Sequence, residues 1–158
     1  MNKKRKISII ILSILIFLTL AFIWGNSMIP KGESGQGSSS IFNKIVKPIT
    51  DFLFGKDNFT HTHFRKTIHA VEFFVLAVEI VCLYCLVNRL KGVNYFTVFT
   101  YGIFVAVLDE AIQILSNRGA MVLDVLIDYL GYIVGTALSY LVLYICYKIK
   151  TRKIEQKK

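Results

Sequence analysis

The sequence predicts an all-α, polytopic membrane protein with four transmembrane helices and an amphipathic interfacial helix in the first extracytoplasmic loop. Of its 158 residues, 54% are hydrophobic, and the mean hydropathy is +0.56, which is too apolar for an ordinary soluble domain. Four long apolar segments cover about residues 7–24, 67–87, 95–115 and 122–147. Each has the roughly 18 residues that a helix needs to cross about 30 Å of hydrocarbon.

The first apolar segment follows a basic stretch, Lys3 to Lys6, as a secretory signal would. It ends in Phe22-Ile23-Trp24 with no small-x-small cleavage pattern, which favours an uncleaved anchor. Most of the nineteen Lys and Arg residues lie before the first segment, between the second and third, and after the fourth. Because basic residues concentrate on cytoplasmic flanks, we expect both termini in the cytoplasm.

These assignments describe one membrane domain over residues 1–158, with an outer loop at 25–66 and a cytoplasmic tail at 148–158. Short connections predict that the last three segments are antiparallel neighbours. The net charge of +9 is explained by membrane topology, and without an Arg/aromatic pattern we expect no nucleic-acid partner. The three cysteines, Cys82, Cys85 and Cys146, all fall within apolar segments and are typical of packing residues.

The outer loop carries a second helical signal. Residues 32–40 (GESGQGSSS) have the composition of a flexible segment. Apolar residues then recur at helical spacing, with Lys44 and Lys47 on the other side: Ile41, Phe42, Ile45, Val46, Ile49, Phe52 and Leu53. This pattern predicts an amphipathic helix, kinked at Pro48, on the outer membrane surface. A loop helix packed against the bundle is the alternative.

Carboxylates from three segments are predicted to lie at one depth. At 1.5 Å per residue, Glu72 lies about 8 Å below the outer surface, and the acids of the third and fourth segments lie within about 10 Å of it. Glu79 is deeper, near the midplane. A central carboxylate that faces lipid costs about 2.5 to 3.5 kcal/mol, so we expect these groups to face an inward cavity. On the fourth segment, Gly131-x-x-x-Gly135 continues the acidic face and predicts close helix packing.

The polar residues of this layer form the predicted ligand-binding set. Its members are Arg65, Lys66, His69, Glu72, Asp109, Glu110, Gln113, Arg118, Asp124 and Asp128. The basic residues suit a lipid-linked phosphate, and the acids suit hydroxyl or amide groups. Catalytic roles stay unassigned. An enzyme could use His69, oriented by Glu72, as a base, or two of the acids as a general acid and a general base. The candidate catalytic residues are His69, Glu72, Asp109, Glu110, Asp124 and Asp128. An ion-pair network that only holds the helices together is the alternative.

A metal site receives little support from the sequence. His61, His63 and His69 could join a carboxylate, but a flexible stretch separates the first two from the third. We therefore expect no metal and no cofactor.

The ordered motifs resemble those of the VanZ-like family of small bacterial membrane proteins. They are Arg65-Lys66-x-x-His69-x-x-Glu72-Phe73, Asp109-Glu110-x-x-Gln113, Arg118, and Asp124 with Asp128-x-x-Gly131, preceded by Trp24-Gly25-Asn26-Ser27. The chain departs at Phe73, where a Tyr is expected. The resemblance covers about residues 22–135.

The resemblance implies a role at the bacterial cell envelope, in the cytoplasmic membrane. The family's namesake confers teicoplanin resistance, so a role in glycopeptide resistance is one expectation. The expected partner is a membrane lipid or a lipid-linked cell-wall intermediate, and the oligomeric state is open. Two alternatives remain: an intramembrane enzyme acting on a lipid phosphate, and a structural or accessory membrane subunit.

Overall fold

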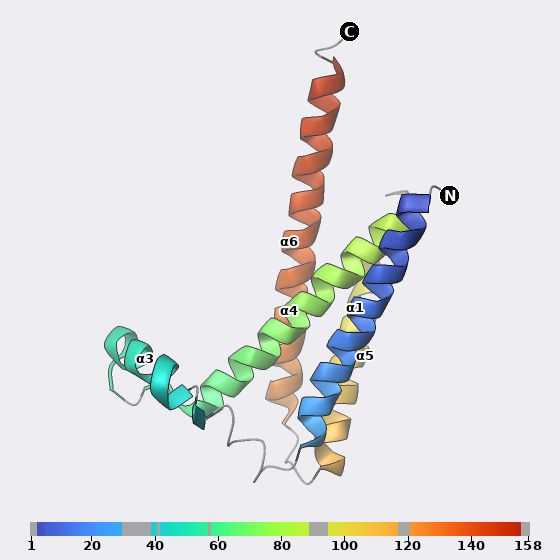
Figure 1. Ribbon diagram of the computed structural model, residues 1–158. Coiled ribbons are helices and arrows are strands. Elements are labelled where there is room, and N and C mark those ends of the chain that lie inside the picture. Colours follow the sequence, from blue (N-terminus) through green and yellow to red (C-terminus); the bar gives the residue numbers. More distant parts are fainter. Residues whose placement is uncertain are drawn as a thin grey trace.

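The computed structural model describes residues 3–29, 39–40, 42–56, 58–88, 95–116 and 121–155. Their named elements are α1 (Lys3–Met28), the π-helix η1 (Phe42–Val46), α3 (Lys47–Phe54), α4 (His61–Asn88), α5 (Tyr95–Leu115) and α6 (Val122–Glu155). The four longest, α1, α4, α5 and α6, are long and apolar enough to cross a membrane (Figure 1). The predicted class, an all-α protein with four membrane-spanning helices, is confirmed.

The helices extend beyond three of the four predicted spans. Only α5 coincides with its predicted range, residues 95–115. The helix α4 begins at His61, so it includes Arg65 and Lys66, which the sequence had placed in the outer loop. With 34 residues, α6 is about 51 Å long and continues to Glu155, into the predicted tail. Its end projects past the rest of the bundle, on the side where both termini lie (Figure 1).

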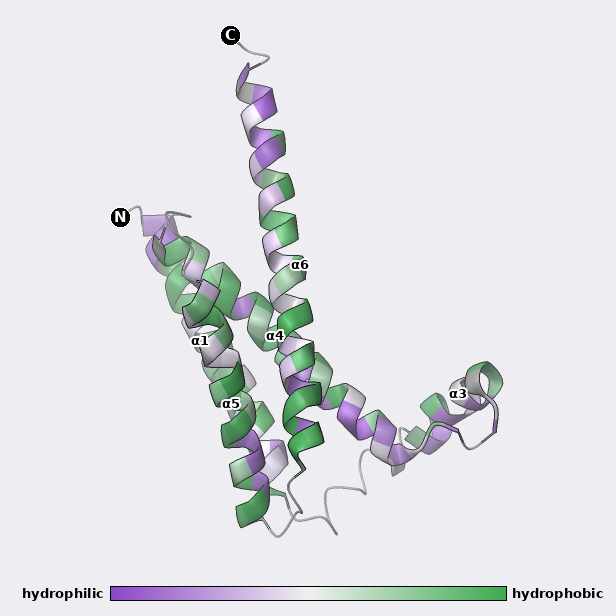
Figure 2. Cartoon of the chain, turned by 180° about the vertical axis from the view of Figure 1, so that it is seen from behind, coloured by the Kyte–Doolittle hydropathy of each residue, from purple (hydrophilic) through white to green (hydrophobic). Residues whose placement is uncertain are grey.

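The distribution of apolar side chains is that of a membrane protein. Large apolar residues such as Phe17, Phe22 and Phe104 are exposed on the outside of the bundle, whereas Asp109 and Asp128 are buried inside it. The hydropathy colouring shows mostly hydrophobic residues along α1 and α5, and hydrophilic residues at the start of α4 and toward the end of α6 (Figure 2). In lipid, the exposed apolar residues need no protein partner, so helix association depends on close packing and polar contacts.

Glycines allow the helices to approach closely. A Cβ on Gly131 would overlap the carbonyl of Ala70 in α4, and one on Gly135 would lie 2.6 Å from the Phe74 carbonyl oxygen. The predicted packing role of Gly131-x-x-x-Gly135 is therefore confirmed, and α4 with α6 forms the most extensive helix pair. Similarly, Tyr132 of α6 packs its ring directly on Gly102 of α5.

The helix α3 stands away from the bundle (Figure 1). Its extensive contacts within the described residues are with η1, and Ile49, Phe52 and Leu53 on it are exposed. The segment touches the bundle through η1, where Phe42 is buried against His61 and Phe64 of α4. Both the position on a membrane surface and the alternative of a helix packed on the bundle therefore stay predictions. Pro48 lies in the first turn of α3, directly after η1, where its missing N–H costs little. The kink expected at this residue stays a prediction.

Candidate functional site

A polar cavity of about 290 Å³ lies at the end of the bundle opposite the termini. The start of α4, the end of α5 and the start of α6 meet there. Its lining residues are Thr62, Arg65, Lys66, His69, Glu110, Gln113, Met121, Asp124, Ile127 and Asp128. The cavity thus includes seven of the ten residues of the predicted ligand-binding set. Glu72 and Asp109 are buried on the same helices, and Arg118 lies outside the described residues.

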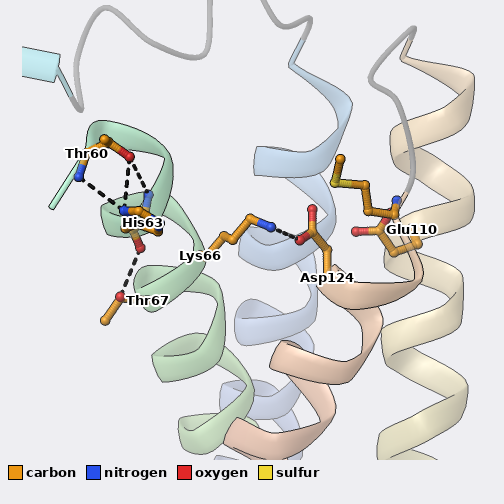
Figure 3. Close-up of polar contacts among 7 residues, drawn as sticks. Thr60, His63, Lys66, Thr67, Glu110 and Asp124 are labelled. Carbon is orange, nitrogen blue, oxygen red and sulfur yellow. Dashed lines mark hydrogen bonds and ion pairs between the residues drawn. The ribbon is translucent and has the colours of Figure 1, made fainter. Parts of the chain in front are cut away.

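Two cationic side chains line the cavity near its mouth. Lys66 Nζ lies 2.5 Å from Asp124 Oδ1, and both side chains stay partly exposed, at 28% and 26%. Figure 3 shows Lys66 reaching from α4 across to Asp124 on the first turn of α6. Because solvent reaches this pair, it contributes about 1 kcal/mol or less to stability. Arg65, next to Lys66 in the chain, also lines the cavity.

Deeper in the bundle, His69 and Glu72 form a pair. His69 Nδ1 lies 3.3 Å from Glu72 Oε2, and their side chains are 13% and 8% exposed. The other carboxylate oxygen, Oε1, accepts a hydrogen bond of 3.3 Å from Asn26 Nδ2 at the end of α1. The spacing of three residues places His69 and Glu72 on one face of α4. Neither Nδ1 nor Oε2 has a hydrogen-bond partner among the described residues, so the contact is a close approach of the two groups rather than an aligned hydrogen bond.

Asp109 of α5 is fully buried and held on both oxygens. Ser27 Oγ donates to Oδ1 at 2.7 Å, and Gln113 Nε2 donates to Oδ2 at 2.8 Å. A buried carboxylate is tolerated only when such partners replace its hydration. Ser27 thereby joins α1 to the site.

Glu110, the neighbour of Asp109, reaches toward the start of α6. Its Oε2 accepts a hydrogen bond of 3.2 Å from the backbone N–H of Met121, one residue before that helix begins. Figure 3 shows the Glu110 side chain directed at this turn. A carboxylate at a helix N-terminus is favourable because it accepts from an unpaired N–H and lies at the positive end of the helix dipole. The Oε1 atom is buried without a hydrogen-bond partner in the described part of the chain.

Asp128 lies where the three helices converge. It is 2% exposed, and none of the described residues donates a hydrogen bond to it, although it lines the cavity. One ligand atom each from His69, Asp109 and Asp128 lie within 4.8 Å of one another. These three residues could hold a metal ion, although the sequence predicted no metal site.

The other two histidines belong to a different environment. His63 Nδ1 accepts a hydrogen bond of 3.2 Å from the Thr60 backbone N–H, at the first turn of α4. His61 packs edge-on against the buried ring of Phe42, with the ring centroids 5.5 Å apart. The sequence suggested His61, His63 and His69 as joint metal ligands. The structure groups only His69 with carboxylates, Asp109 and Asp128.

The site also contains residues that the sequence had not placed in it. Asn26 and Ser27 lay outside the predicted first span, which ended near Trp24, but α1 continues to Met28 and brings both into contact with buried acids. The signal available in the sequence was their membership of the Trp24-Gly25-Asn26-Ser27 motif. Glu79 lies apart from the cavity and accepts a hydrogen bond of 3.1 Å from Thr19 Oγ1 of α1.

An apolar hollow of about 720 Å³ lies between α1 and α4. Leu18 and Phe22 of α1 and Val71 and Val75 of α4 contribute to its lining, together with Glu72. Glu72 therefore borders the apolar hollow while its partner His69 lines the polar cavity. A ligand with a polar head and a hydrocarbon chain would find surfaces of both kinds around this pair.

Comparison with known proteins agrees with the motifs. No curated protein and no solved structure matches the chain significantly. The model of the VanZ/LLP1 family matches residues 7–144, from the second turn of α1 to about two thirds along α6, and this range includes every residue that lines the cavity. The chain is therefore a multipass, helical membrane protein of the VanZ/LLP1 family.

Proposed function

We propose that this protein acts at the bacterial cell envelope by binding the phosphate of a membrane lipid or of a lipid-linked cell-wall intermediate in its polar cavity. The observation that carries the proposal is that Arg65 and Lys66, both partly exposed, line the same cavity as the buried acids Glu110 and Asp128. Guanidinium and ammonium groups bind phosphate oxygens, and the acids accept hydrogen bonds from hydroxyl or amide groups.

The placement of the cavity supports a lipid ligand. It lies near the ends of three helices that are long and apolar enough to span a membrane, on the side of the bundle away from the termini (Figure 1). A position this close to the helix ends corresponds to lipid headgroups if these helices span the membrane. With both termini in the cytoplasm, as proposed from the basic flanks, this side is the outer one. The apolar hollow between α1 and α4 has the dimensions and lining for a hydrocarbon chain.

Direct binding tests this proposal. The full chain is reconstituted in nanodiscs, and its affinity is measured for undecaprenyl phosphate, for a phosphatidic acid and for uncharged undecaprenol. We expect at least one of the two phosphates to bind, and we expect undecaprenol to bind at least tenfold more weakly than that phosphate. The preferred phosphate then identifies the source of the headgroup.

The matched variants are Arg65→Gln in the cavity and Lys44→Gln on the exposed surface of η1. Losing a hydrogen bond to a charged group costs about 1.5 to 3 kcal/mol, so Arg65→Gln should weaken phosphate binding about 10- to 100-fold. Lys44→Gln removes the same charge from the chain and should leave the affinity unchanged. Equal affinity for undecaprenol and its phosphate, or equal effects of the two variants, would contradict the proposal.

A role in glycopeptide resistance, including teicoplanin resistance, is proposed from family membership. Glu72→Gln removes the charge next to His69, and Asp124→Asn removes a charge that lines the cavity; both keep the side-chain shape. We expect these variants to abolish the protection of cells from glycopeptide while the membrane level of the protein stays normal. Reduced abundance, with protection in proportion to the protein that remains, would instead indicate a structural or accessory subunit.

The His69–Glu72 pair favours a second candidate, an intramembrane enzyme acting on a lipid phosphate. A carboxylate 3.3 Å from Nδ1 favours the protonated imidazole and so supports the proton uptake that a general base requires. Purified protein should then convert a bound lipid phosphate, with loss of turnover in His69→Ala but not in His63→Ala. If the protein binds lipid phosphates but converts none of them, the enzyme candidate is contradicted and only the binding function remains.

A further inference from the structure

We propose that His69, Asp109 and Asp128 form a site for a divalent cation that accepts mixed nitrogen and oxygen ligands, Zn²⁺ or Mn²⁺. The three side chains come from α4, α5 and α6, and one ligand atom from each lies within 4.8 Å of the other two. Imidazole nitrogen with two carboxylate oxygens is a ligand set that both ions use in proteins.

Asp128 is a buried carboxylate without a hydrogen-bond donor among the described residues, which makes it a candidate cation ligand. It is 98% buried, lines the cavity, and receives no hydrogen bond from the part of the chain that the structure describes. Buried carboxylates are stable only when they are hydrogen-bonded, paired with a cation or bound to a metal. Of the Lys and Arg side chains that line the cavity, Lys66 is paired with Asp124, and neither Lys66 nor Arg65 forms an ion pair with Asp128 in the described part of the chain.

The residues behind the cluster are arranged as those behind metal ligands are. His69 Nδ1 faces Glu72 Oε2, which leaves Nε2 as the nitrogen to bind a metal. A hydrogen bond between Nδ1 and Oε2, for which a small rotation of the ring suffices at 3.3 Å, would fix the imidazole and increase its strength as a ligand. Asp109 is likewise held in place by hydrogen bonds from Ser27 and Gln113.

The geometry requires only a small closure. Metal–ligand bonds of about 2.1 Å place neighbouring ligand atoms about 3 to 3.5 Å apart, so the side chains would move inward by about 1 Å. The backbone beneath them is already close, because Gly131, one turn after Asp128, packs against Ala70, the residue after His69. The two positive charges of the cation would balance the negative charges of Asp109 and Asp128. The negative charge of Glu72 would stabilise the partial positive charge that the metal induces on the His69 imidazole.

This inference goes beyond the proposed phosphate binding, and it is tested without added lipid. The full-length protein is purified in detergent, stripped with chelator and dialysed against Zn²⁺, Mn²⁺ or Mg²⁺, and the bound metal per chain is measured by mass spectrometry. We expect about one Zn²⁺ or Mn²⁺ ion per chain and little Mg²⁺, because imidazole is a poor ligand for Mg²⁺. Co²⁺ in the same site should give visible absorption bands that report nitrogen ligation.

The paired variants are Asp128→Asn in the cluster and His63→Ala outside it. Asp128→Asn should weaken metal binding at least tenfold, and His63→Ala should bind as the parent chain does. If Asp128→Asn fails to fold, His69→Gln replaces it, and the Co²⁺ spectrum of the parent chain is an independent readout. A parent chain that binds no ion, or an ion that both variants retain, would overturn the metal site. Phosphate binding could still be found in either case, so the two proposals fail separately.

Discussion

Substituting Gly131 by alanine should push α4 away from α6 at the base of the site. The added Cβ would lie 2.9 Å from Ala70 Cα and 2.8 Å from its carbonyl carbon. Nonbonded carbon atoms rest about 3.5 to 4.0 Å apart, so the two backbones must separate by about 1 Å. No flexible side chain can move aside, because the overlapping atoms belong to the α4 backbone.

The expected cost of this separation is that of an overpacked core, about 1 to 3 kcal/mol. Alanine also favours a helix over glycine by up to about 1 kcal/mol, which partly hides the steric cost. Gly25 of α1 supplies the matched control, since a Cβ there would meet nothing within 4 Å. Gly25→Ala should be neutral or slightly stabilising, and the difference between the two variants isolates the steric cost.

The assay is reversible unfolding in mixed micelles, monitored by circular dichroism for the parent chain and both variants. Gly131→Ala should be less stable than Gly25→Ala by about 1 to 3 kcal/mol. It should also weaken Zn²⁺ binding, because Ala70 follows His69 and Gly131 lies one turn from Asp128. Free energies of unfolding that agree within about 0.5 kcal/mol would refute the reasoning about close packing.

Two further changes test polar contacts of α1. Ser27→Ala removes the donor 2.7 Å from Asp109 Oδ1 and should lower the free energy of unfolding by about 1 to 3 kcal/mol. Ser13→Ala, on the exposed face of α1, is the control and should have no measurable effect. Equal stabilities of the two variants would contradict a stabilising role of the Ser27–Asp109 hydrogen bond. Arg5→Gln removes two hydrogen bonds, of 2.7 and 2.9 Å, to the carbonyls of Leu86 and Val87 at the end of α4. The free energy of local opening of the last turn of α4, measured by amide hydrogen exchange, should fall by about 0.5 to 1.5 kcal/mol. Lys6→Gln is its control, and identical exchange in both variants would rule out this capping contact.

The membrane spans and the depth of the acids could be predicted because both depend on local properties. Apolar length identifies a spanning helix, and a rise of 1.5 Å per residue assigns a depth to each polar residue. These two rules predicted one layer for Glu72, Asp109 and Asp128; the structure buries all three and brings Asp109 and Asp128 together beside His69. Helical spacing likewise predicted the packing face of Gly131 and Gly135.

Short connections were a weaker guide to which helices touch. They predicted α4, α5 and α6 as successive neighbours, yet α4 packs far more on α6 than on α5. Gly131 and Gly135 explain the preference, because a helix that offers glycines lets another backbone come close. The sequence contained these glycines but not the helix that would lie against them.

The sequence by itself determined that four helices cross the membrane and that their charges must face inward, because the cost of exposing a carboxylate to lipid does not depend on its neighbours. The tertiary structure alone decided which charges meet. Ser27 holds Asp109, Asn26 and His69 hold Glu72, and His69 lies beside Asp128. Such pairings depend on how helices distant in the chain are rotated and packed against each other, and backbone contacts of a few ångströms set that rotation.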